Sequence, residues 1–578
     1  MKYPASLVAC LTICAVLLGY RSHYTDKGSP GKPLMLTQWD AFGYYLYLPA
    51  TIIYHDFKKL DWATAVDQKY NVTGGDGMPV QHLENGNKAC KYFGGVALLQ
   101  LPLFTIAHLW AKSTGSPADG FSPPYQYALG YGLLLYCFLG IFLLRHILLR
   151  YFDDRVTAIT LLLLCLASNF IQYAAVDGGL SHAWIFLLYV ALLYATIKWH
   201  ERAHAGWSML TGYIIGIAMI CRPTEAIALA IPLLWNTHTR EAATAKWRQV
   251  RTHRLHVLYA IVGGILGILP QLLYWKSVTG SFIYDVGSKW MFLNPWFRVL
   301  FGWEKGWFIY TPVTIFFVLG LLFMKRYPFY KSVLVFCLLN IWIVIAWEDW
   351  RYGGSYSTRA LVQSYPVFAL ALGSFVERIQ WKKWRIAFYV PCIYLVGVNL
   401  FQIVQYNSTV LHYNDMNRRY YSRIYLNPAP DPIDMSLLDT DDWLSNEAGY
   451  SAKQLVLTAQ PIAVHSDANT PTHLVDVGLP DNGSAERWLK IEAHLVAHEG
   501  LWKSVLTAEL HYSDTTKRAS IRLDNPVGKK TGHYAMYLKL PQKPGHGKLV
   551  IFLSTAARLD GTVDRLKVTE LTRSTTGQ

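Results

Sequence analysis

The first residue whose position points to chemistry is Asp40, which lies between an apolar N-terminal segment and the aromatic run 41–49. Residues 4–20 are apolar enough to enter a membrane, so Asp40 is expected at a membrane surface. A carboxylate is poorly solvated there and usually has a function. It can accept a proton as a general base. The structural alternative is an N-cap, because aspartate accepts hydrogen bonds from the free N–H groups of a helix that starts near Ala41.

A second group of polar residues occurs at the ends of later apolar segments. Its members are Lys91, Asp177, His182, Arg222, Arg351 and Arg359. Short outer loops of membrane proteins are normally poor in Lys and Arg. Basic residues that occur there need an anionic partner, for which phosphate is the candidate. Contact with phospholipid headgroups, or pairing with Asp177, Glu348 or Asp349, explains any one of them equally well. Together they indicate an anion site beside carboxylates.

The elements that must position these residues are membrane helices. Of the 578 residues, 52% are hydrophobic and only 16% are charged, which is typical of a polytopic membrane protein with a more polar part attached. The net charge of +15 does not indicate nucleic-acid binding. Its excess lies in short segments between apolar runs, as in cytoplasmic loops. These segments are 145–155, 198–206, 238–255, 325–331 and 377–385, which hold 17 Lys and Arg.

Hydropathy and loop charge together predict about eleven transmembrane helices. The expected spans are about 4–20, 124–148, 156–175, 182–199, 207–221, 225–237, 256–276, 307–325, 330–347, 358–376 and 384–404. The two short spans that meet at Arg222-Pro223 should break there, because proline interrupts a helix. The apolar stretch 92–112 must begin and end outside if both flanking basic loops are inside. It is therefore expected to lie along or dip into the outer leaflet.

The C-terminal region follows a different pattern. Residues 405–454 are expected to form a linker, and from about 455 to 578 short segments alternate apolar and polar residues, as in half-buried strands. This pattern predicts a small β-sandwich on the extracytoplasmic side. The eight cysteines form no C-x-x-C metal pair, and no metal-ligand set is evident. Dependence on a divalent metal is left open.

Residues 1–404 resemble the GT-C superfamily of glycosyltransferases, in particular its protein mannosyltransferase and aminoarabinose transferase branch. The resemblance rests on Asp40, Tyr44-Tyr45, the run Lys91-Tyr-Phe-Gly-Gly95, Asp177 and Arg222, in this order. Asp40 resembles the catalytic aspartate, Lys91 the lysine that holds the lipid phosphate, and Asp177 the second-loop aspartate. Many relatives have an acidic pair in the first loop, whereas Ala41 follows Asp40 here.

The resemblance implies a bacterial inner-membrane enzyme that takes a sugar from a polyprenyl-phosphate donor at the outer face. The acceptor would be a hydroxyl group of a lipid, glycan or protein. We expect Asp40 to act as the base, Lys91 and Arg222 to hold the phosphate, and Asp177 to orient the acceptor. Arg351 and Arg359 are secondary phosphate ligands, and Tyr44, Tyr45 and His182 are further site candidates. Direct attack would invert the anomeric centre.

Two other classes of function fit parts of the sequence. A transporter or flippase for lipid-linked saccharides would explain polar outer residues without a reaction. Transporters commonly carry internal repeats with broken helices near the membrane midplane. No convincing repeat is present, and the polar residues cluster outside. A scaffold whose sandwich binds polysaccharide would leave Asp40 and Lys91 without a role.

Overall fold

The computed structural model describes most of the chain in two compact units, 1–400 and 401–578, which are treated separately. The described residues are 3–25, 33–380, 385–458, 460–481, 485–499, 501, 503–512, 515–523, 531–542, 545–556 and 558–573. Parts of the expected first outer loop (26–32), of one basic loop (381–384) and of the expected sandwich therefore lie outside the description.

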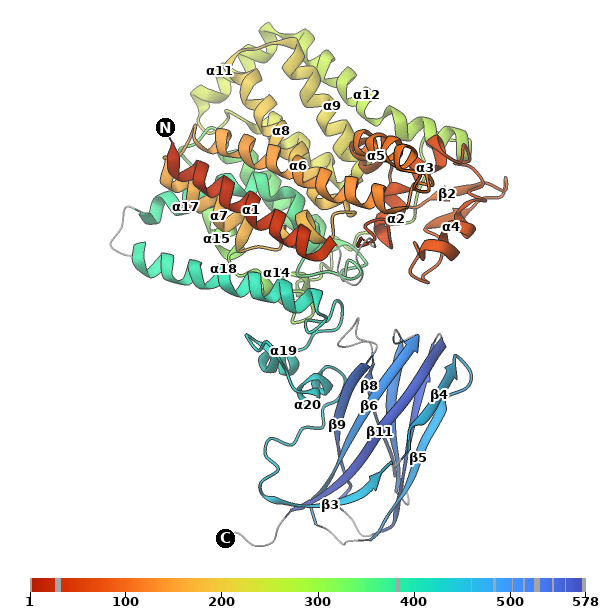
Figure 1. Cartoon of the computed structure of the whole chain (residues 1–578). Helices are drawn as coiled ribbons and strands as arrows, with labels where there is room; N and C mark the ends of the chain where they lie inside the picture. Colours follow the sequence, from red (N-terminus) through yellow and green to blue (C-terminus); the bar gives the residue numbers. More distant parts are fainter. Residues whose placement is uncertain are drawn as a thin grey trace. The chain divides into compact units, whose positions relative to one another are not determined.

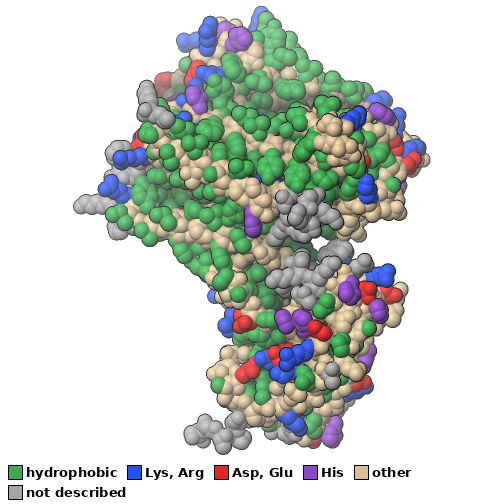
Figure 2. All heavy atoms as spheres, in the orientation of Figure 1, with side chains coloured by type: hydrophobic (Ala, Val, Ile, Leu, Met, Phe, Trp, Pro, Cys, Tyr) green, Lys and Arg blue, Asp and Glu red, His purple; other side chains and the backbone are tan. Residues whose placement is uncertain are grey.

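The first unit is mainly helical and includes one short pair of antiparallel strands (Figure 1). Its main helices are α1 (Pro4–Thr25), α5 (Gly95–Thr114), α6 (Pro123–Leu148), α7 (Asp154–Leu166), α8 (Ser181–Glu201), α9 (Ala205–Cys221), α12 (Arg254–Thr279), α16 (Tyr330–Ala346), α17 (Tyr365–Gln380) and α18 (Arg385–Asn407). Among the described residues, seven helices are long and apolar enough to cross a membrane, and four shorter apolar helices accompany them. The expected polytopic helical fold is confirmed, while the number of spans stays a prediction. Figure 2 shows apolar side chains over most of the visible face of this unit.

Hydrogen bonds at both ends of α1 fix its direction. The Asp154 carboxylate at the start of α7 accepts from the N–H groups of Ala5 and Ser6, at 2.8 and 3.0 Å. At the other end, Arg21 donates to the carbonyl oxygen of Val176 at 3.4 Å. The N-terminus therefore lies with the basic loop before α7, and the end of α1 lies with Asp177. This agrees with the side that loop charge assigns to each.

Three expected spans contain irregular helix. The predicted break at Arg222-Pro223 is confirmed, because α9 ends at Cys221 and a 3₁₀ helix, Pro223–Leu229, leads into α10 (Ala230–Leu234). Arg222 has extended backbone angles, as expected for a residue before proline. The expected span 156–175 consists of α7 followed by a π-helix, Gln172–Val176. The span 307–325 consists of α14 (Trp307–Tyr310), α15 (Thr314–Gly320) and a 3₁₀ turn, with Pro312 at the first break.

The first outer loop folds around a core of aromatic side chains. Its elements are α2 (Asp40–Tyr45), α3 (Tyr47–Ile52), α4 (Ala63–Tyr70) and the antiparallel strands β1 (Val80–His82) and β2 (Lys88–Cys90). Phe42, Tyr45, Phe121 and Tyr125 form part of the buried core. Because β2 ends at Cys90, the Lys91-Tyr92 pair leaves the hairpin directly beside α2.

Helix α5, the stretch expected not to cross, packs along the outer half of α6. Tyr136 donates its hydroxyl hydrogen to the Leu99 carbonyl at 3.0 Å, and the rings of Trp110 and Tyr127 lie 6.2 Å apart. These contacts run from the middle of α6 to its beginning. The 20 residues of α5 are also long enough to cross a membrane. The prediction that α5 stays at the outer surface therefore rests on these contacts and on the basic loops, which place both ends of α5 on the same side.

The described residues of the second unit form nine antiparallel strands in two sheets (Figure 1). One sheet has the order β5-β10-β7-β8, and the other has the order β3-β11-β6-β9 with β4 also paired to β11. The strands are β3 (Tyr450–Leu457), β4 (Ile462–Asp467), β5 (Thr472–Leu479), β6 (Arg487–Glu499), β7 (Ser504–Tyr512), β8 (Thr515–Arg522), β9 (Thr531–Lys539), β10 (Gly547–Thr555) and β11 (Arg558–Arg573). Apolar residues of both sheets form one core, as in a sandwich.

The expected linker 405–454 belongs to this second unit. It contains α19 (Arg418–Ile424) and α20 (Pro432–Met435), and its acidic residues pair with the sheet. Asp439 lies 2.7 Å from the Arg522 guanidinium, and Asp442 lies 2.5 Å from the Lys517 ammonium. The acidic residues of this segment therefore attach it to basic residues of the strands.

Candidate active site

Asp40 is the first residue of α2, and no side-chain hydrogen bond caps the start of this helix. The residue before it, Trp39, occupies the N-cap position without a side-chain cap and has a φ of 57°. A positive φ is unusual for tryptophan, and such backbone conformations are concentrated at functional sites. The Asp40 carboxylate instead accepts a hydrogen bond from the Tyr92 hydroxyl at 2.5 Å and pairs with Arg359. The N-cap alternative therefore does not describe its contacts.

Arg359 comes from the other end of the helical unit's sequence. It begins a 3₁₀ helix, Arg359–Ser364, which leads into α17. Its side chain is 10% exposed, whereas that of Asp40 is 31% exposed. The carboxylate is thus held by a buried guanidinium and still has an accessible face. Lys305 supports the preceding loop by donating to the carbonyl oxygens of Arg351, at 2.7 Å, and Gly353.

Tyr92 reaches Asp40 because α2 carries a glycine where the two segments meet. A Cβ atom at Gly43 would lie 2.1 Å from the Tyr92 ring. The ring of Tyr44 packs edge-on against Tyr92 at 4.8 Å. Burial and the negative charge of Asp40 raise the pKa of Tyr92, so its hydroxyl keeps its proton and donates to the carboxylate.

Lys91 lies beside this tyrosine with an exposed side chain. Its backbone N–H donates to the Pro79 carbonyl at 3.0 Å, which fixes the start of the segment. Among the described residues its ammonium has no hydrogen-bond or ion-pair partner. The charge is therefore available to an anion that approaches from the outer side.

The second outer loop, which carries Asp177, packs at Gly179 against the residues on either side of Asp40. A Cβ atom at Gly179 would lie 1.8 Å from the Leu36 carbonyl oxygen and 2.6 Å from the Ala41 Cβ. Glycine at this position therefore allows the two loops to touch. The Asp177 carboxylate accepts a hydrogen bond from the Gln172 amide at 2.9 Å.

The two carboxylates have opposite electrostatic surroundings. Burial acts to raise the pKa of Asp40, but Arg359, the Tyr92 hydrogen bond and Arg222 outweigh it, so the pKa of Asp40 is lowered. Burial dominates at Asp177 and raises its pKa, although Gln172, Arg359 and Arg21 partly offset the effect. A pair of acidic groups whose pKa values are moved apart is typical of sites where proton transfer occurs.

Arg222 is the other cation near Asp40. It follows the last residue of α9, and its charge contributes to the lowered pKa of Asp40. The structure gives its guanidinium no hydrogen bond or ion pair with the described residues. Arg222 therefore differs from Arg359, whose charge is already used by a carboxylate.

A chain of buried polar side chains lies behind these residues. The His182 ring nitrogen Nδ1 is 2.7 Å from the Gln363 amide oxygen, and Gln363 donates to Glu225 at 2.9 Å. Glu225 also accepts a hydrogen bond from Tyr189. Glu225 follows Arg222 by one helical turn, so this network connects the basic residue to α8 and to the segment after Arg359.

The structure brings together most, but not all, of the predicted site residues. Asp40, Tyr44 and Arg359 share one cluster. Arg222 is close enough to lower the pKa of Asp40, and Asp177 is close enough for Arg359 to influence its pKa. His182 lies in the buried polar chain behind the cluster. Tyr45 instead lies in the core of the first loop, where its hydroxyl donates to Gly120. Arg351 is exposed, its guanidinium stacks on Trp350 at 5.2 Å, and its carbonyl oxygen accepts a hydrogen bond from Lys305.

Sequence reasoning missed Tyr92, Glu225, Gln363 and Lys305 as site residues. Glu225 could have been found, because an acidic residue inside an apolar span is a functional candidate by default. Among the described residues no group of three or more His, Cys, Asp or Glu side chains is placed to hold a metal ion.

An apolar cavity of about 540 Å³ opens beside the cluster. Its wall includes Tyr47 of α3, Gly94 and Leu98 at the start of α5, and Gln271 and Tyr274 of α12. Gly94, two residues after Tyr92, donates its N–H to the Gln271 amide oxygen at 2.8 Å. The cavity therefore begins next to the segment that carries Lys91 and Tyr92.

No family model and no curated protein sequence matches this chain. Among solved structures, it is similar to the archaeal oligosaccharyltransferase AglB from Archaeoglobus fulgidus, in complex with an inhibitory peptide and a dolichol-phosphate. The identity is 11% and the TM-score 0.44, over 72% of this chain and 57% of that one. ArnT from Cupriavidus metallidurans bound to undecaprenyl phosphate has an identity of 13% and a TM-score of 0.43, over 72% of this chain and 68% of that one. The arabinosyltransferase EmbB from Mycobacterium smegmatis has an identity of 10% and a TM-score of 0.32, over 97% of this chain and 64% of that one.

The chain thus spans just over half the length of the oligosaccharyltransferase. Two of these three structures are named as transferases, an oligosaccharyltransferase and an arabinosyltransferase. The identities and TM-scores are too low to assign an activity. The functional argument therefore rests on the residues of the cluster.

Proposed function

We propose that the protein is a membrane glycosyltransferase that moves a sugar from a polyprenyl-phosphate donor to an acceptor hydroxyl at the outer face of a bacterial cytoplasmic membrane. The observation that carries the proposal is the Asp40 cluster. A partly exposed carboxylate is held by Arg359 and Tyr92, while Arg222 and Lys91 have no partner among the described residues. A carboxylate beside available cations suits a reaction that removes a proton and releases a phosphate.

In this mechanism Asp40 accepts the proton of the acceptor hydroxyl as that oxygen attacks the anomeric carbon. Its lowered pKa keeps the carboxylate ionised before the reaction. The bond from the sugar to the phosphate oxygen breaks at the same time. Arg222 and Lys91 stabilise the negative charge that develops on the phosphate. A single displacement of this kind inverts the anomeric centre, and retention in the product would contradict it.

Binding of the donor also changes the environment of the base. A phosphate near Arg222 and Arg359 competes with Asp40 for their positive charge, which raises the basicity of the carboxylate as the complex forms. Asp177, whose pKa is raised, carries a proton over a wider pH range and can donate a hydrogen bond to a sugar or acceptor oxygen. We therefore assign Asp177 an orienting role.

The lipid part of the donor has a suitable location in the cavity beside Gly94. Its apolar wall begins next to Lys91 and Tyr92, so a polyprenyl chain inside it would place its phosphate by these residues. Donors with a short or water-soluble carrier would not fill this cavity. The hydrocarbon chain should therefore contribute to donor affinity.

The alternative function is a transporter or flippase for lipid-linked saccharides. To separate the two, purified protein is incubated with a labelled polyprenyl-phosphate sugar, in detergent and in sealed vesicles. Transfer to a hydroxyl acceptor, or slow release of free sugar, supports the enzyme. Movement of intact donor across the vesicle membrane without turnover would overturn the proposal in favour of transport.

A further inference from the structure

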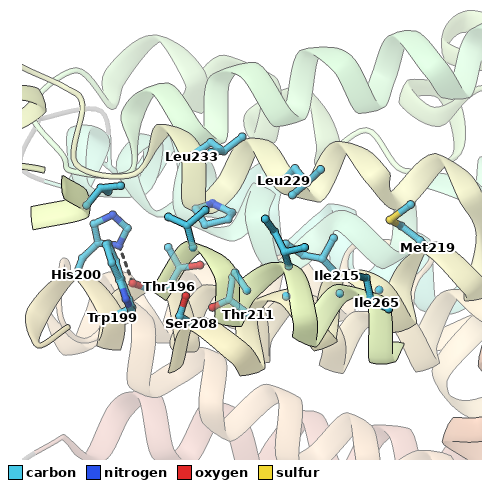
Figure 3. Close-up of a pocket in the computed structure, with 18 of the residues that line it drawn as sticks. Thr196, Trp199, His200, Ser208, Thr211, Ile215, Met219, Leu229, Leu233 and Ile265 are labelled. Atoms are coloured by element: carbon cyan, nitrogen blue, oxygen red, sulfur yellow. Dashed lines mark hydrogen bonds between the residues drawn. The ribbon is translucent and has the colours of Figure 1, made fainter. Parts of the chain in front are cut away.

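A second cavity, of about 630 Å³, lies between α8, α9, α10, α11 (Arg240–Thr252) and α12. It shares no lining residue with the cavity beside Gly94. One wall runs along α9 from Ser208 to Met219, and another runs along α12 from Val257 to Ile268. Figure 3 shows Trp199, His200 and Ser208 at one end, and Met219 and Ile265 at the other.

This second cavity is an open groove, and close packing of α9 on α12 forms its floor. Cβ atoms at Gly212 and Gly216 would lie 1.8 and 2.4 Å from carbonyl oxygens of Ala260 and Gly264, so small residues let the two backbones touch. Gly264 differs, since a Cβ there would meet only the Gly212 carbonyl oxygen at 3.7 Å. The groove is thus a depression built by missing side chains.

The open side of the groove is apolar. Leu233, Val257 and Ile261, which line it, are 53%, 47% and 55% exposed. Because α12 is long and apolar enough to cross a membrane, we expect this side to face hydrocarbon and not water. An occupant that enters from this side must itself be a hydrocarbon chain.

The other end of the groove is polar and basic. Thr196 is 1% exposed, and its hydroxyl has no partner among the described residues. Lys246 donates to the carbonyl oxygens of Pro232, at 2.9 Å, and Leu233, which fixes α11 against the end of α10. Arg248 and Arg251 do not line the groove, but they directly follow its lining residues Trp247 and Val250 on this helix, and their side chains are exposed. The helix carries Glu241 as its one acidic residue.

The length of the groove indicates which lipid fits. Ser208 to Met219 spans about 16 Å at the helical rise of about 1.5 Å per residue. This is close to half of a hydrocarbon core of about 30 Å, the depth of one leaflet. Both walls start three residues after their helices begin, next to the basic loops assigned to the cytoplasmic side. A polyprenyl chain would be much longer than this groove.

We propose that this groove binds one acyl chain of an anionic phospholipid from the cytoplasmic leaflet, with its headgroup held by Arg248 and Arg251. Basic residues beside a membrane helix attract the anionic lipids of that leaflet. The site is separate from the donor cavity, so it does not depend on the proposed reaction.

Native mass spectrometry of the purified full-length protein, after extensive detergent exchange, tests the site. The wild type should retain one anionic phospholipid per chain. Gly264→Leu fills the groove and should lose it. Gly397→Leu, at a position of α18 with nothing within 4 Å of a Cβ, is the matched control and should keep it.

A second pair of variants tests the headgroup without touching the helix packing. In nanodiscs titrated with phosphatidylglycerol against phosphatidylcholine, Arg248→Gln with Arg251→Gln should weaken retention of the anionic lipid by roughly ten- to thirty-fold. Equal retention in Gly264→Leu and wild type would overturn the proposal. So would a wild type that retains no lipid, or one that retains polyprenyl phosphate at this site.

Discussion

Tyr92 and Arg359 hold Asp40 in its ionised form, and this arrangement makes a prediction about pH. Removal of the Tyr92 hydroxyl withdraws a hydrogen bond from the charged carboxylate, so the pKa of Asp40 rises. The acid limb of kcat/KM in the wild type should lie below the usual range of an aspartate, because Arg359, Tyr92 and Arg222 lower the pKa of Asp40. In Tyr92→Phe the acid limb should move to higher pH.

The matched control is Tyr70→Phe, which removes a tyrosine hydroxyl from another first-loop carboxylate, Asp119, at 2.6 Å. Its profile should follow that of the wild type. If Tyr92→Phe also follows the wild type across the acid range, Asp40 does not set the acid limb.

Lys91 leads to a prediction about donor affinity. Its ammonium is exposed and has no partner among the described residues, so its loss removes charge from the site without breaking a contact in the protein. Lys91→Ala should weaken donor binding, and Lys91→Arg should retain part of it, since the charge stays but its geometry changes. Binding is measured by titration with a polyprenyl phosphate. Lys88→Ala, three residues earlier, is the control. Equal donor affinity in the two alanine variants would show that Lys91 does not bind the donor and contacts only phospholipid headgroups.

At the scale of elements, the close contact between the two outer loops positions Asp177 near Asp40. Gly179→Ala places a methyl group against the Leu36 carbonyl oxygen and should separate the loops. We expect a loss of about 1–3 kcal/mol of stability, as for other overpacked sites. A marked loss of activity should accompany it. Gly19→Ala in α1, where a Cβ meets nothing within 4 Å, should leave both unchanged.

Thermal unfolding and transfer assays on both variants check this expectation. A Gly179→Ala protein with wild-type stability and activity would show that the loop contact is not needed for the site.

The position of α5 is the element on which the outer location of Asp177 and Arg222 depends. If α5 does not cross the membrane, positions 85 and 118 both face outwards. A cysteine introduced at either position, in a background without Cys90, should react with an impermeant maleimide in intact spheroplasts. Reaction of position 118 only after permeabilisation would place α5 across the membrane. The sides assigned to the later loops would then reverse.

For the whole molecule, the sequence predicted those helices, breaks and strands that depend on the local order of apolar and polar residues. Long apolar runs located the helices, and Pro223 located the break after Arg222. Alternation in the segments 487–496, 502–511, 533–540 and 548–553 located β6, β7, β9 and β10. The other five strands of the second unit, and the short strands β1 and β2 of the first loop, were missed. The alternation in β11, for example, is interrupted by Gly561 and Asp564, and its place is set by pairing with β3, β4 and β6.

The site was predicted as a set of residues and not as a set of pairs. Asp40 and Arg359 were both selected as site candidates because charged residues at an outer membrane surface are costly and usually have a function. Their ion pair joins positions 319 residues apart, and no local pattern predicts such a contact. Tyr92 was missed as a ligand of Asp40 because an aromatic residue in an aromatic segment carries no signal of its own.

The measurement that tests the central claim most directly is the single-turnover rate of sugar transfer by Asp40→Asn, at saturating donor and acceptor. The substitution keeps the shape of the side chain and removes the charge and the basic oxygen. We predict transfer slower by ~10² to 10⁴, the range for loss of a positioned base. Donor binding should be retained or tighter, because Arg359 loses its carboxylate partner.

Asp61→Asn serves as the control, because Asp61 is a first-loop aspartate whose side chain is 81% exposed. It should transfer sugar at the wild-type rate. If Asp40→Asn keeps most of the wild-type rate under the same conditions, Asp40 is not the base and Asp177 becomes the leading candidate.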